Sequence, residues 1–399
     1  MRVVEVRHRN VPLSRFAPVP AAPPGPAGGA LATTVVALVS DVVRAGRPVV
    51  GYGFASVGRA PVGGLLDERF ADRLLAAFDR PDADTGGDDG GTDDLDPFAL
   101  WPHLMAGEKP GGHGERCVAV GCLDMALWDL AGKLAGEPVH HLLARRLGRP
   151  PQDGVRVYAA GGYRYPDVDP ATDRRLLAEE VHRFLDLGHT HVKIKIADAP
   201  LATDLDRVDA ALAVLGDGSR LAVDALNRYS GESLTTAADA LAGRGLWWFE
   251  DPCDPLDLVA LADLARSYPG PLAAGEALFS LPDARNLLRY GGLRPGHDRL
   301  VFDPVHCYGV PEYVRIVEEF ERAGWTRDAF WPHGGHLFAV HVAAALGLGG
   351  AELAPLAFQP FGGPPDGVTV SDGLLALPQE PGIGFERRRA LRDLFATLA

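Results

Sequence analysis

Lysine is almost absent from this 399-residue chain: of its 39 basic residues, only Lys109, Lys133, Lys193 and Lys195 are lysines. Cysteine is scarce too, and its four residues form neither a CxxC pair nor an even framework, which favours a reducing, cytoplasmic compartment. No apolar run approaches the roughly 18 residues that a membrane span needs. The first residues alternate as a strand would, without the pattern of a signal peptide.

The charge balance excludes further classes of partner. The formal net charge is −14, and no stripe of basic residues stands out. Both features argue against binding to nucleic acid or to anionic membranes. A hydrophobic content of 47% beside 23% charged residues is ordinary for a globular protein.

Two of the four lysines lie two residues apart, in the segment HVKIKIA. In a strand, Val192, Ile194 and Ile196 would face one way, and Lys193 and Lys195 the other. Arginine, which this chain otherwise prefers, cannot serve where a cation must lose its proton. Repulsion between the two ammonium groups should lower the pKa of at least one of them toward the operating pH, as a general base requires. The alternative is an ordinary solvated strand face.

A series of acidic residues and one histidine follows at nearly constant spacing. Asp224, Glu250, Glu276, Asp303 and His333 are separated by 26, 26, 27 and 30 residues. One strand, one helix and two short loops take roughly 25–30 residues, so each residue falls at the same place in successive βα units. Such residues converge only if the units close into a barrel, whose active site lies at the C-terminal ends of the strands. The spacing therefore predicts a barrel and the place of its site.

The chain is predicted to have three regions. Residues 1–150 form an α+β domain, with strands near its start, an Ala/Val-rich helix at 30–44 and helices near 66–80 and 115–147. Its acidic, Gly-rich segment 81–97 lacks the last glutamate of an EF-hand, so we interpret it as a flexible loop. Residues 151–370 form the barrel, and 371–399 return to the first domain. The eight strand candidates are 155–160, 191–196, 220–225, 246–251, 271–276, 299–303, 329–333 and 350–355.

The three carboxylates at the ends of the third, fourth and fifth strand candidates predict a metal site. Asp224, Glu250 and Glu276 offer hard oxygen ligands without imidazole or thiolate, which suits Mg²⁺. Zinc would want nitrogen or sulfur ligands. Any one of these residues alone would more often be structural, but three at one level of a barrel favour the metal.

A histidine–carboxylate pair completes the candidate site. Asp303 would orient His333 and raise its pKa, which makes the histidine an acid or base opposite the lysines. His336 opens the following helix and His341 lies within it, so we assign these two supporting or structural roles.

Lysine, histidine and a divalent cation together predict one kind of reaction. A carboxylate substrate would chelate the metal, a base would remove the α-proton, and the metal would stabilise the enediolate. The opposite group would then either reprotonate the carbon, giving racemisation, or protonate a β-hydroxyl and expel water. A non-catalytic binding protein would be expected to lack a ligand or a base, and none is missing. A dehydrogenase would need GxGxxG after a strand, which is not evident.

The segments KIK, VDALN, FED and AGE, with the pair Asp303 and His333, resemble the mandelate racemase branch of the enolase superfamily. The helix motif DMALWDLAGKLAG at 124–136 is similar to a motif of that branch. The resemblance covers essentially the whole chain. It implies a (β/α)7β modified TIM barrel, an N-terminal α+β capping domain completed by the C-terminal segment, and a homo-oligomer.

Within that branch, KPGGHGER, VYAAGGY, PHGGH, GLGGAE and FQPFGGPPDGV resemble the D-tartrate dehydratases, which convert tartrate to oxaloacetate. The likeness implies that Lys195 is the base, that His333 is the acid for loss of the β-hydroxyl, and that Lys193 lies near the metal-bound carboxylate. Lys109 would reach the distal carboxylate of a diacid. Further substrate contacts implied by the likeness are Tyr163, Asn227 and Glu352.

One segment departs from the tartrate dehydratase pattern. The capping loop reads GFASVGR, with Ala55 and Val57 at substrate-contacting positions where amide side chains would be expected. A site that loses such hydrogen bonds can lose orders of magnitude on that substrate. A related hydroxy-diacid or acid sugar therefore stays open as the substrate.

Overall fold

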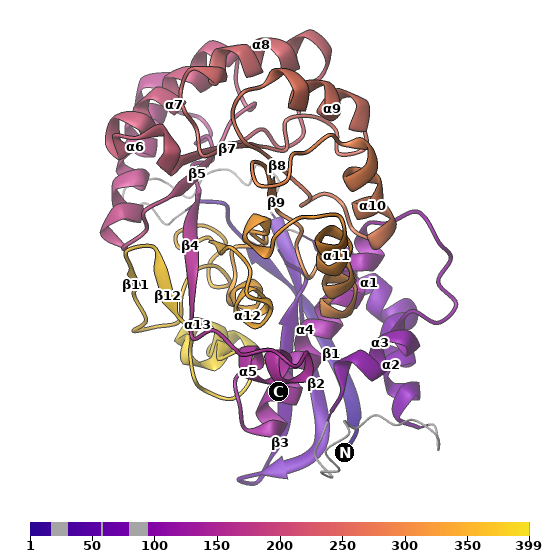
Figure 1. Cartoon of the computed structure of the whole chain (residues 1–399). Helices are drawn as coiled ribbons and strands as arrows, with labels where there is room; N and C mark the ends of the chain where they lie inside the picture. The colour runs from indigo at the N-terminus through magenta and orange to yellow at the C-terminus, as the bar shows by residue number, and fades with distance from the viewer. Residues whose placement is uncertain (17–30, 57–58, 80–94, 399) are drawn as a thin grey trace.

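The computed structural model describes residues 1–16, 31–56, 59–79 and 95–398 (Figure 1). Val57 and most of the acidic 81–97 segment lie outside these residues. The described chain forms an antiparallel sheet with its helices, then a barrel of parallel strands, then a short C-terminal segment. No helix within these ranges is long and apolar enough to cross a lipid bilayer.

The N-terminal sheet is an antiparallel meander of β1 (Val3–Leu13), β2 (Leu31–Arg44) and β3 (Arg47–Phe54). The predicted helix at 30–44 is therefore wrong. Every residue from Thr33 to Ser40 is buried, so the segment lacks the alternation that marks a strand with one wet face. The segment forms a strand because its β-branched residues favour extended backbone and because it pairs on both sides, with β1 and with β3.

Helix α4 (Glu115–Ala135) fills the centre of the capping domain and lies against β3. A Cβ at Gly51 would meet the Ala126 carbonyl oxygen at 2.3 Å, and one at Gly53 would meet the Cys122 carbonyl oxygen at 2.4 Å. Only glycine allows this close approach of strand and helix. The other helices of the domain are α1 (Val62–Leu65), η1 (Leu66–Phe70), α2 (Ala71–Phe78), α3 (Pro97–Leu104) and α5 (Val139–Arg146).

The barrel strands run parallel in chain order, and the last pairs with the first. They are β4 (Gly154–Gly161), β5 (Val192–Lys195), β6 (Leu221–Asp224), β7 (Trp248–Glu250), β8 (Leu272–Ala274), β9 (Arg299–Leu300) and β10 (Ala351–Leu353). β10 pairs with β4 and closes the ring. The helices between β4 and β10 are α6 (Pro170–Asp186), α7 (Leu201–Leu215), η2 (Gly218–Arg220), α8 (Gly231–Ala242), α9 (Leu258–Ser267), α10 (Leu281–Tyr290), α11 (Val310–Arg322), η3 (Arg327–Ala329) and α12 (Leu337–Leu346). In Figure 1 the helices α6 to α10 lie around the outside of the strands.

The predicted strand at 329–333 is not a regular strand. It forms one isolated bridge, between Leu300 and Phe330, and Trp331 donates its N–H to the Leu300 carbonyl. Pro332 has no N–H to continue a ladder, although its carbonyl accepts from the N–H of Glu352. The segment still links β9 to β10 and so occupies the seventh place in the ring.

The C-terminal segment contacts both domains. Its strands β11 (Val370–Ser371) and β12 (Leu374–Ala376) extend the sheet beside β4. It then passes through η4 (Phe385–Arg387) to α13 (Arg389–Phe395), where Phe395 stacks on Tyr52 of β3 with ring centroids 4.6 Å apart. The predicted fold, a (β/α)7β barrel with a capping domain that the C-terminal segment completes, is confirmed.

Candidate active site

The two lysines of β5 point into the barrel, as the alternation predicts. Val192, Ile194 and Ile196 lie in the hydrophobic core, whereas Lys193 and Lys195 meet carboxylates. Lys195 is the last residue of β5, so its ammonium group lies at the C-terminal mouth of the barrel. There it pairs with Asp224 and lies 5.6 Å from the centre of the Tyr163 ring.

The three predicted metal ligands come together at this mouth. Asp224 ends β6, Glu250 ends β7, and Glu276 follows β8. One carboxylate oxygen from each lies within 4.8 Å of the other two. Asp224 and Glu250 are fully buried, whereas the Glu276 side chain is 20% exposed, and its buried Oε2 has no hydrogen-bond partner in the described chain. Three clustered carboxylates, one of them with an oxygen that accepts no hydrogen bond from the described residues, fit a hard divalent cation such as Mg²⁺.

Lys193 bridges the bottom of the site and is fully buried. Its ammonium group pairs with Glu250, lies 2.7 Å from Glu352 Oε2 and lies 3.5 Å from Asp224 Oδ2. The hydroxyl of Tyr158 donates to the same Glu352 oxygen at 3.0 Å. Glu352, which the resemblance placed at the substrate, is thus held by a lysine and a tyrosine.

The prediction that repulsion lowers the pKa of at least one of the two lysines is wrong. Burial lowers the pKa of both ammonium groups, but the negative charge of Asp224 raises that of Lys195, and the charges of Glu250 and Glu352 raise that of Lys193. In both lysines the attraction wins, and the pKa rises above its ordinary value. For Lys195, the repulsion from Lys193 is smaller than the attraction to Asp224, and the nearness of that carboxylate is not evident from the sequence.

The pair Asp303 and His333 has the predicted geometry. Asp303 Oδ2 lies 3.0 Å from Nδ1 of His333, and Nε2 of the ring lies 3.4 Å from Glu276 Oε2. Burial lowers the pKa of His333, but the charges of Glu276 and Glu352 and the hydrogen bond to Asp303 raise it to about 10. His333 is followed by two glycines that have no room for a side chain. A Cβ at Gly334 would meet the His336 ring at 2.6 Å, and one at Gly335 would meet the Ala354 side chain at 2.8 Å.

A capping-domain hydroxyl that the sequence did not single out completes this pair. Ser56 is buried, has a positive φ of 46°, and donates its hydroxyl to Asp303 Oδ2 at 3.0 Å. Its own carbonyl accepts from the hydroxyl of Thr33 at 2.8 Å. Its neighbour Ala55 is fully buried and has no polar side-chain atom, and Val57 is not among the described residues.

Two further polar side chains at the mouth were also missed. His306 is buried beside His333, with ring centroids 5.4 Å apart, and its Nε2 has no hydrogen-bond partner among the described residues. Arg59 is the last residue of the capping loop GFASVGR and lies 5.3 Å from the centre of the Phe279 ring, while one of its nitrogens pairs with Glu115 at 2.6 Å. The spacing argument could not find them, because neither falls on the strand-end ladder.

Of the remaining predicted substrate contacts, Tyr163 lies at the site, whereas Asn227 and Lys109 form no hydrogen bond or ion pair with its lysines or proposed metal ligands in the described chain. Tyr163 lies beside Lys195. The Asn227 side chain donates to Asp251 Oδ2 at 3.1 Å, so its amide is bound to a neighbouring carboxylate and not to one of the three proposed metal ligands. Asp251 is itself buried, and burial together with the charge of Glu276 raises its pKa well above the ordinary value. Lys109 is exposed and makes no hydrogen bond or ion pair within the described part of the chain.

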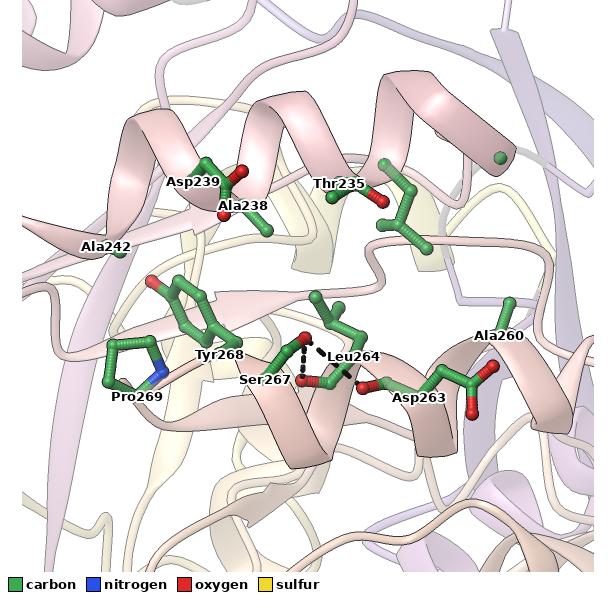
Figure 2. Close-up of a pocket in the computed structure, with 12 residues that line it drawn as sticks. Thr235, Ala238, Asp239, Ala242, Ala260, Asp263, Leu264, Ser267, Tyr268 and Pro269 are labelled. Carbon is green, nitrogen blue, oxygen red and sulfur yellow. Dashed lines mark hydrogen bonds between the residues drawn. The ribbon is translucent and has the colours of Figure 1, made fainter.

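A surface pocket elsewhere lacks the features of a reaction site. Figure 2 shows it between α8 and α9, on the outside of the barrel, with Tyr268 at one end. Asp263 there pairs with Arg266, and Ser267 donates its hydroxyl to backbone carbonyls of its own helix. We place the chemistry at the barrel mouth, where the buried charges converge.

Comparisons with known proteins agree with this geometry. Residues 176–391 match the family described as enolase C-terminal domain-like. The chain is 31% identical over 305 residues to the 3,6-anhydro-alpha-L-galactonate cycloisomerase of Streptomyces coelicolor, which covers 72% of this chain and 75% of that protein. It is 26% identical over 299 residues to the arabinonate dehydratase of Saccharolobus solfataricus, with the same coverage of 72% and 75%.

The solved structures extend the match over the whole chain. A racemase from Streptomyces coelicolor with bound magnesium has a TM-score of 0.70 and 26% identity, and the match covers 98% of this chain and 99% of that one. The predicted magnesium cofactor agrees with the three-carboxylate site and with the metal in that structure.

Proposed function

The chain belongs to the enolase superfamily, in the family described as enolase C-terminal domain-like, and we propose that it is a magnesium-dependent dehydratase of a hydroxy acid. Its relatives include dehydratases, cycloisomerases and racemases, so the general chemistry of the superfamily applies to it. One observation carries the proposal: Lys195 and the pair Asp303–His333 lie around one cluster of three carboxylates.

Asp224, Glu250 and Glu276 would hold the magnesium ion. When bound, Mg²⁺ supplies positive charge that stabilises the anion formed as the substrate loses its α-proton. Both short strands that carry the first two ligands end at these residues, so the backbone fixes their position. Trp248 donates its indole N–H to Glu250 Oε2 at 2.7 Å, which orients that carboxylate further.

Lys195 is the base in this proposal, and Lys193 is not. A divalent cation held by Asp224 would offset the negative charge that raises the pKa of Lys195, and so would favour the neutral amine that a base requires. Lys193 is fully buried between Glu250 and Glu352, whereas the Lys195 side chain is 4% exposed at the strand end beside Tyr163. A substrate at the mouth would reach Lys195 first. Lys193 would hold the carboxylates in place and lie near the carboxylate group of the substrate.

His333 is the acid for departure of the β-hydroxyl. Asp303 can only accept, so Nδ1 of His333 carries the proton of that hydrogen bond, and Nε2 faces the site. A proton delivered from Nε2 to the β-hydroxyl releases water and leaves an enol, which becomes the keto acid.

The substrate class we propose is a hydroxy-diacid or acid sugar, with conversion of D-tartrate to oxaloacetate as the reference reaction. The side chain of Ala55 cannot form a hydrogen bond with a substrate, and the hydroxyl of Ser56 already donates to Asp303. This favours a substrate other than tartrate. Two capping-domain cations lie near the site: Arg59 is 5.3 Å from the centre of the Phe279 ring, and Arg15 is 5.6 Å from the centre of the Tyr163 ring. Lys109, which the sequence assigned to a distal carboxylate, makes no such contact within the described residues.

The test is a screen of purified protein with Mg²⁺ against tartrate isomers and acid sugars, with the keto acid detected as its semicarbazone. Formation of a keto acid from any of them supports the dehydratase, and a hit on D-tartrate shows that Ala55 is tolerated. If no keto acid forms, solvent deuterium exchange at the α-carbon of the same compounds is measured. Exchange without keto acid would replace the proposal by racemisation or epimerisation through the same anion.

A further inference from the structure

Outside the barrel mouth, three potential metal ligands converge where α5 meets the start of β4. His140 and His141 lie in the first turn of α5, and Asp153 immediately precedes β4. Nε2 of His141 lies 3.0 Å from Asp153 Oδ1, and Nε2 of His140 lies 3.6 Å from the same oxygen. All three ligand atoms lie within 4.8 Å of one another.

The His140 ring is buried, and one of its two nitrogens makes no hydrogen bond to the described residues. Its Nε2 has no hydrogen-bond partner among the described residues, although the side chain is 0% exposed. A buried ring nitrogen without a partner is costly, and here it is directed at the oxygen of Asp153. The cluster therefore contains an unsatisfied buried donor atom as well as suitable residue types.

A chain of hydrogen bonds fixes which nitrogen of His140 is free. Nε2 of His341 lies 2.9 Å from the Ile383 carbonyl, which can only accept, so this nitrogen of His341 carries the proton. Nδ1 of His341 is then the acceptor, and it accepts from the backbone N–H of His140 at 3.2 Å. Nδ1 of the His140 ring lies 3.1 Å from the same nitrogen and must also carry a proton, because two lone pairs would repel each other at that distance. The lone pair of His140 is left on Nε2. Metal-binding histidines are held in this way, with the second ring nitrogen donating to another group.

We propose that His140, His141 and Asp153 form a second metal site, which takes a divalent transition metal such as Zn²⁺. Two imidazoles and one carboxylate suit Zn²⁺ better than Mg²⁺. Ligand atoms around tetrahedral zinc are separated by roughly 3.3 Å, given bonds of about 2.0–2.1 Å, and the two histidine–aspartate distances of 3.0 and 3.6 Å bracket that value. The bound metal ties the capping helix α5 to the first barrel strand.

The test uses Co²⁺ as a spectroscopic probe on the full-length protein, with excess Mg²⁺ present to occupy the barrel carboxylates. We expect the visible absorption of a four- or five-coordinate cobalt site, which Zn²⁺ abolishes. His141→Ala and Asp153→Ala should each weaken Co²⁺ binding by about 10-fold or more. Both side chains reach solvent, at 31% and 74% exposure, so the variants are expected to fold. His182→Ala, an exposed histidine on α6, is the matched control and should keep the absorption.

A second readout separates this site from the barrel chemistry. Zn²⁺ added over saturating Mg²⁺ should raise the melting temperature of the parent protein and of His182→Ala, but not of His141→Ala. The Mg²⁺-dependent activity should be equal in all of them. Cobalt absorption that survives in His141→Ala and Asp153→Ala, or that fails to appear in the parent protein, overturns the proposal. Neither result bears on the proposed dehydratase.

Discussion

The hydroxyl of Ser56 lies 3.0 Å from Asp303 Oδ2, so a residue of the capping domain hydrogen-bonds the carboxylate that orients His333. The two residues are 247 positions apart in the chain. Asp303 Oδ1 accepts from the backbone N–H of Val305 at 2.7 Å. The barrel backbone thus holds one carboxylate oxygen, and the other accepts from the capping-domain hydroxyl as well as from His333.

Loss of the Ser56 hydroxyl should misposition the acid without removing it. A typical hydrogen bond contributes about 1 kcal/mol, so Ser56→Ala should lower kcat by roughly 5-fold and leave KM nearly unchanged. The matched control is Ser40→Ala in β2 of the same domain, where the hydroxyl donates to the Val49 carbonyl at 2.8 Å. Equal kcat values for the two variants would show that the contact only stabilises the cap. A pH–rate profile that shifts in Ser56→Ala alone identifies a positioning role.

Lys195→Ala and His333→Asn should each abolish dehydration while Mg²⁺ binding persists. Lys195→Ala should also stop exchange of the α-proton with solvent deuterium, because it removes the base. His333→Asn should retain that exchange, because only the later step needs the acid. Calorimetric Mg²⁺ titration and proton NMR of the substrate measure the two effects. Near-normal turnover in either variant would refute the assigned roles.

Glu276→Gln should weaken magnesium binding without unfolding the protein. Its side chain is 20% exposed and forms no ion pair with a lysine among the described residues, unlike those of Asp224 and Glu250. We expect the Mg²⁺ concentration for half-maximal activity to rise by about 10-fold or more, and the melting temperature of the metal-free protein to stay unchanged. An unchanged Mg²⁺ requirement would exclude Glu276 as a ligand.

Lys133, another of the rare lysines, should be structural. Its ammonium group lies 2.6 Å from the buried Asp129, donates to the Val50 carbonyl at 2.9 Å and pairs with Glu386 of the C-terminal segment. Lys133→Met leaves Asp129 buried with its two backbone N–H donors but without its cation, which should cost about 3–5 kcal/mol in the free energy of unfolding by urea. Lys109→Met, at an exposed lysine, is the control and should stay within about 0.5 kcal/mol of the parent protein.

Asp124 should make the stability depend on pH. Burial raises its pKa to about 8, against the effect of the Val310 N–H that it accepts at 2.7 Å. The unfolded chain has a pKa of about 3.9 for this group, so between about pH 4 and pH 8 the folded state binds more protons than the unfolded state. The free energy of unfolding therefore falls as pH rises through that window.

Asp124→Asn removes this contribution, so its stability should fall less with rising pH than that of the parent protein. Urea unfolding of both proteins at pH 5, 6, 7 and 8 measures the difference. Parallel curves would show that Asp124 is ionised in the folded state at all of these pH values.

Local periodicity was sufficient for the barrel and for most of its site. The strand-end ladder from Asp224 to His333 follows from the length of a βα unit, and closure of the ring then brings those residues together. The same reasoning failed at 30–44, where burial on both faces hides the alternation of β2, and at 329–333, where Pro332 interrupts the ladder.

The sequence by itself determined the barrel order, the metal ligands we propose and the inward direction of Lys193 and Lys195, because each depends on spacing along a single unit. Only the tertiary structure decided the contact of Ser56 with Asp303, the raised pKa of the lysines and the cluster of His140, His141 and Asp153. These depend on distances and burial between segments far apart in the chain. Electrostatic and hydrogen-bond energies are set by such distances, and sequence spacing does not record them.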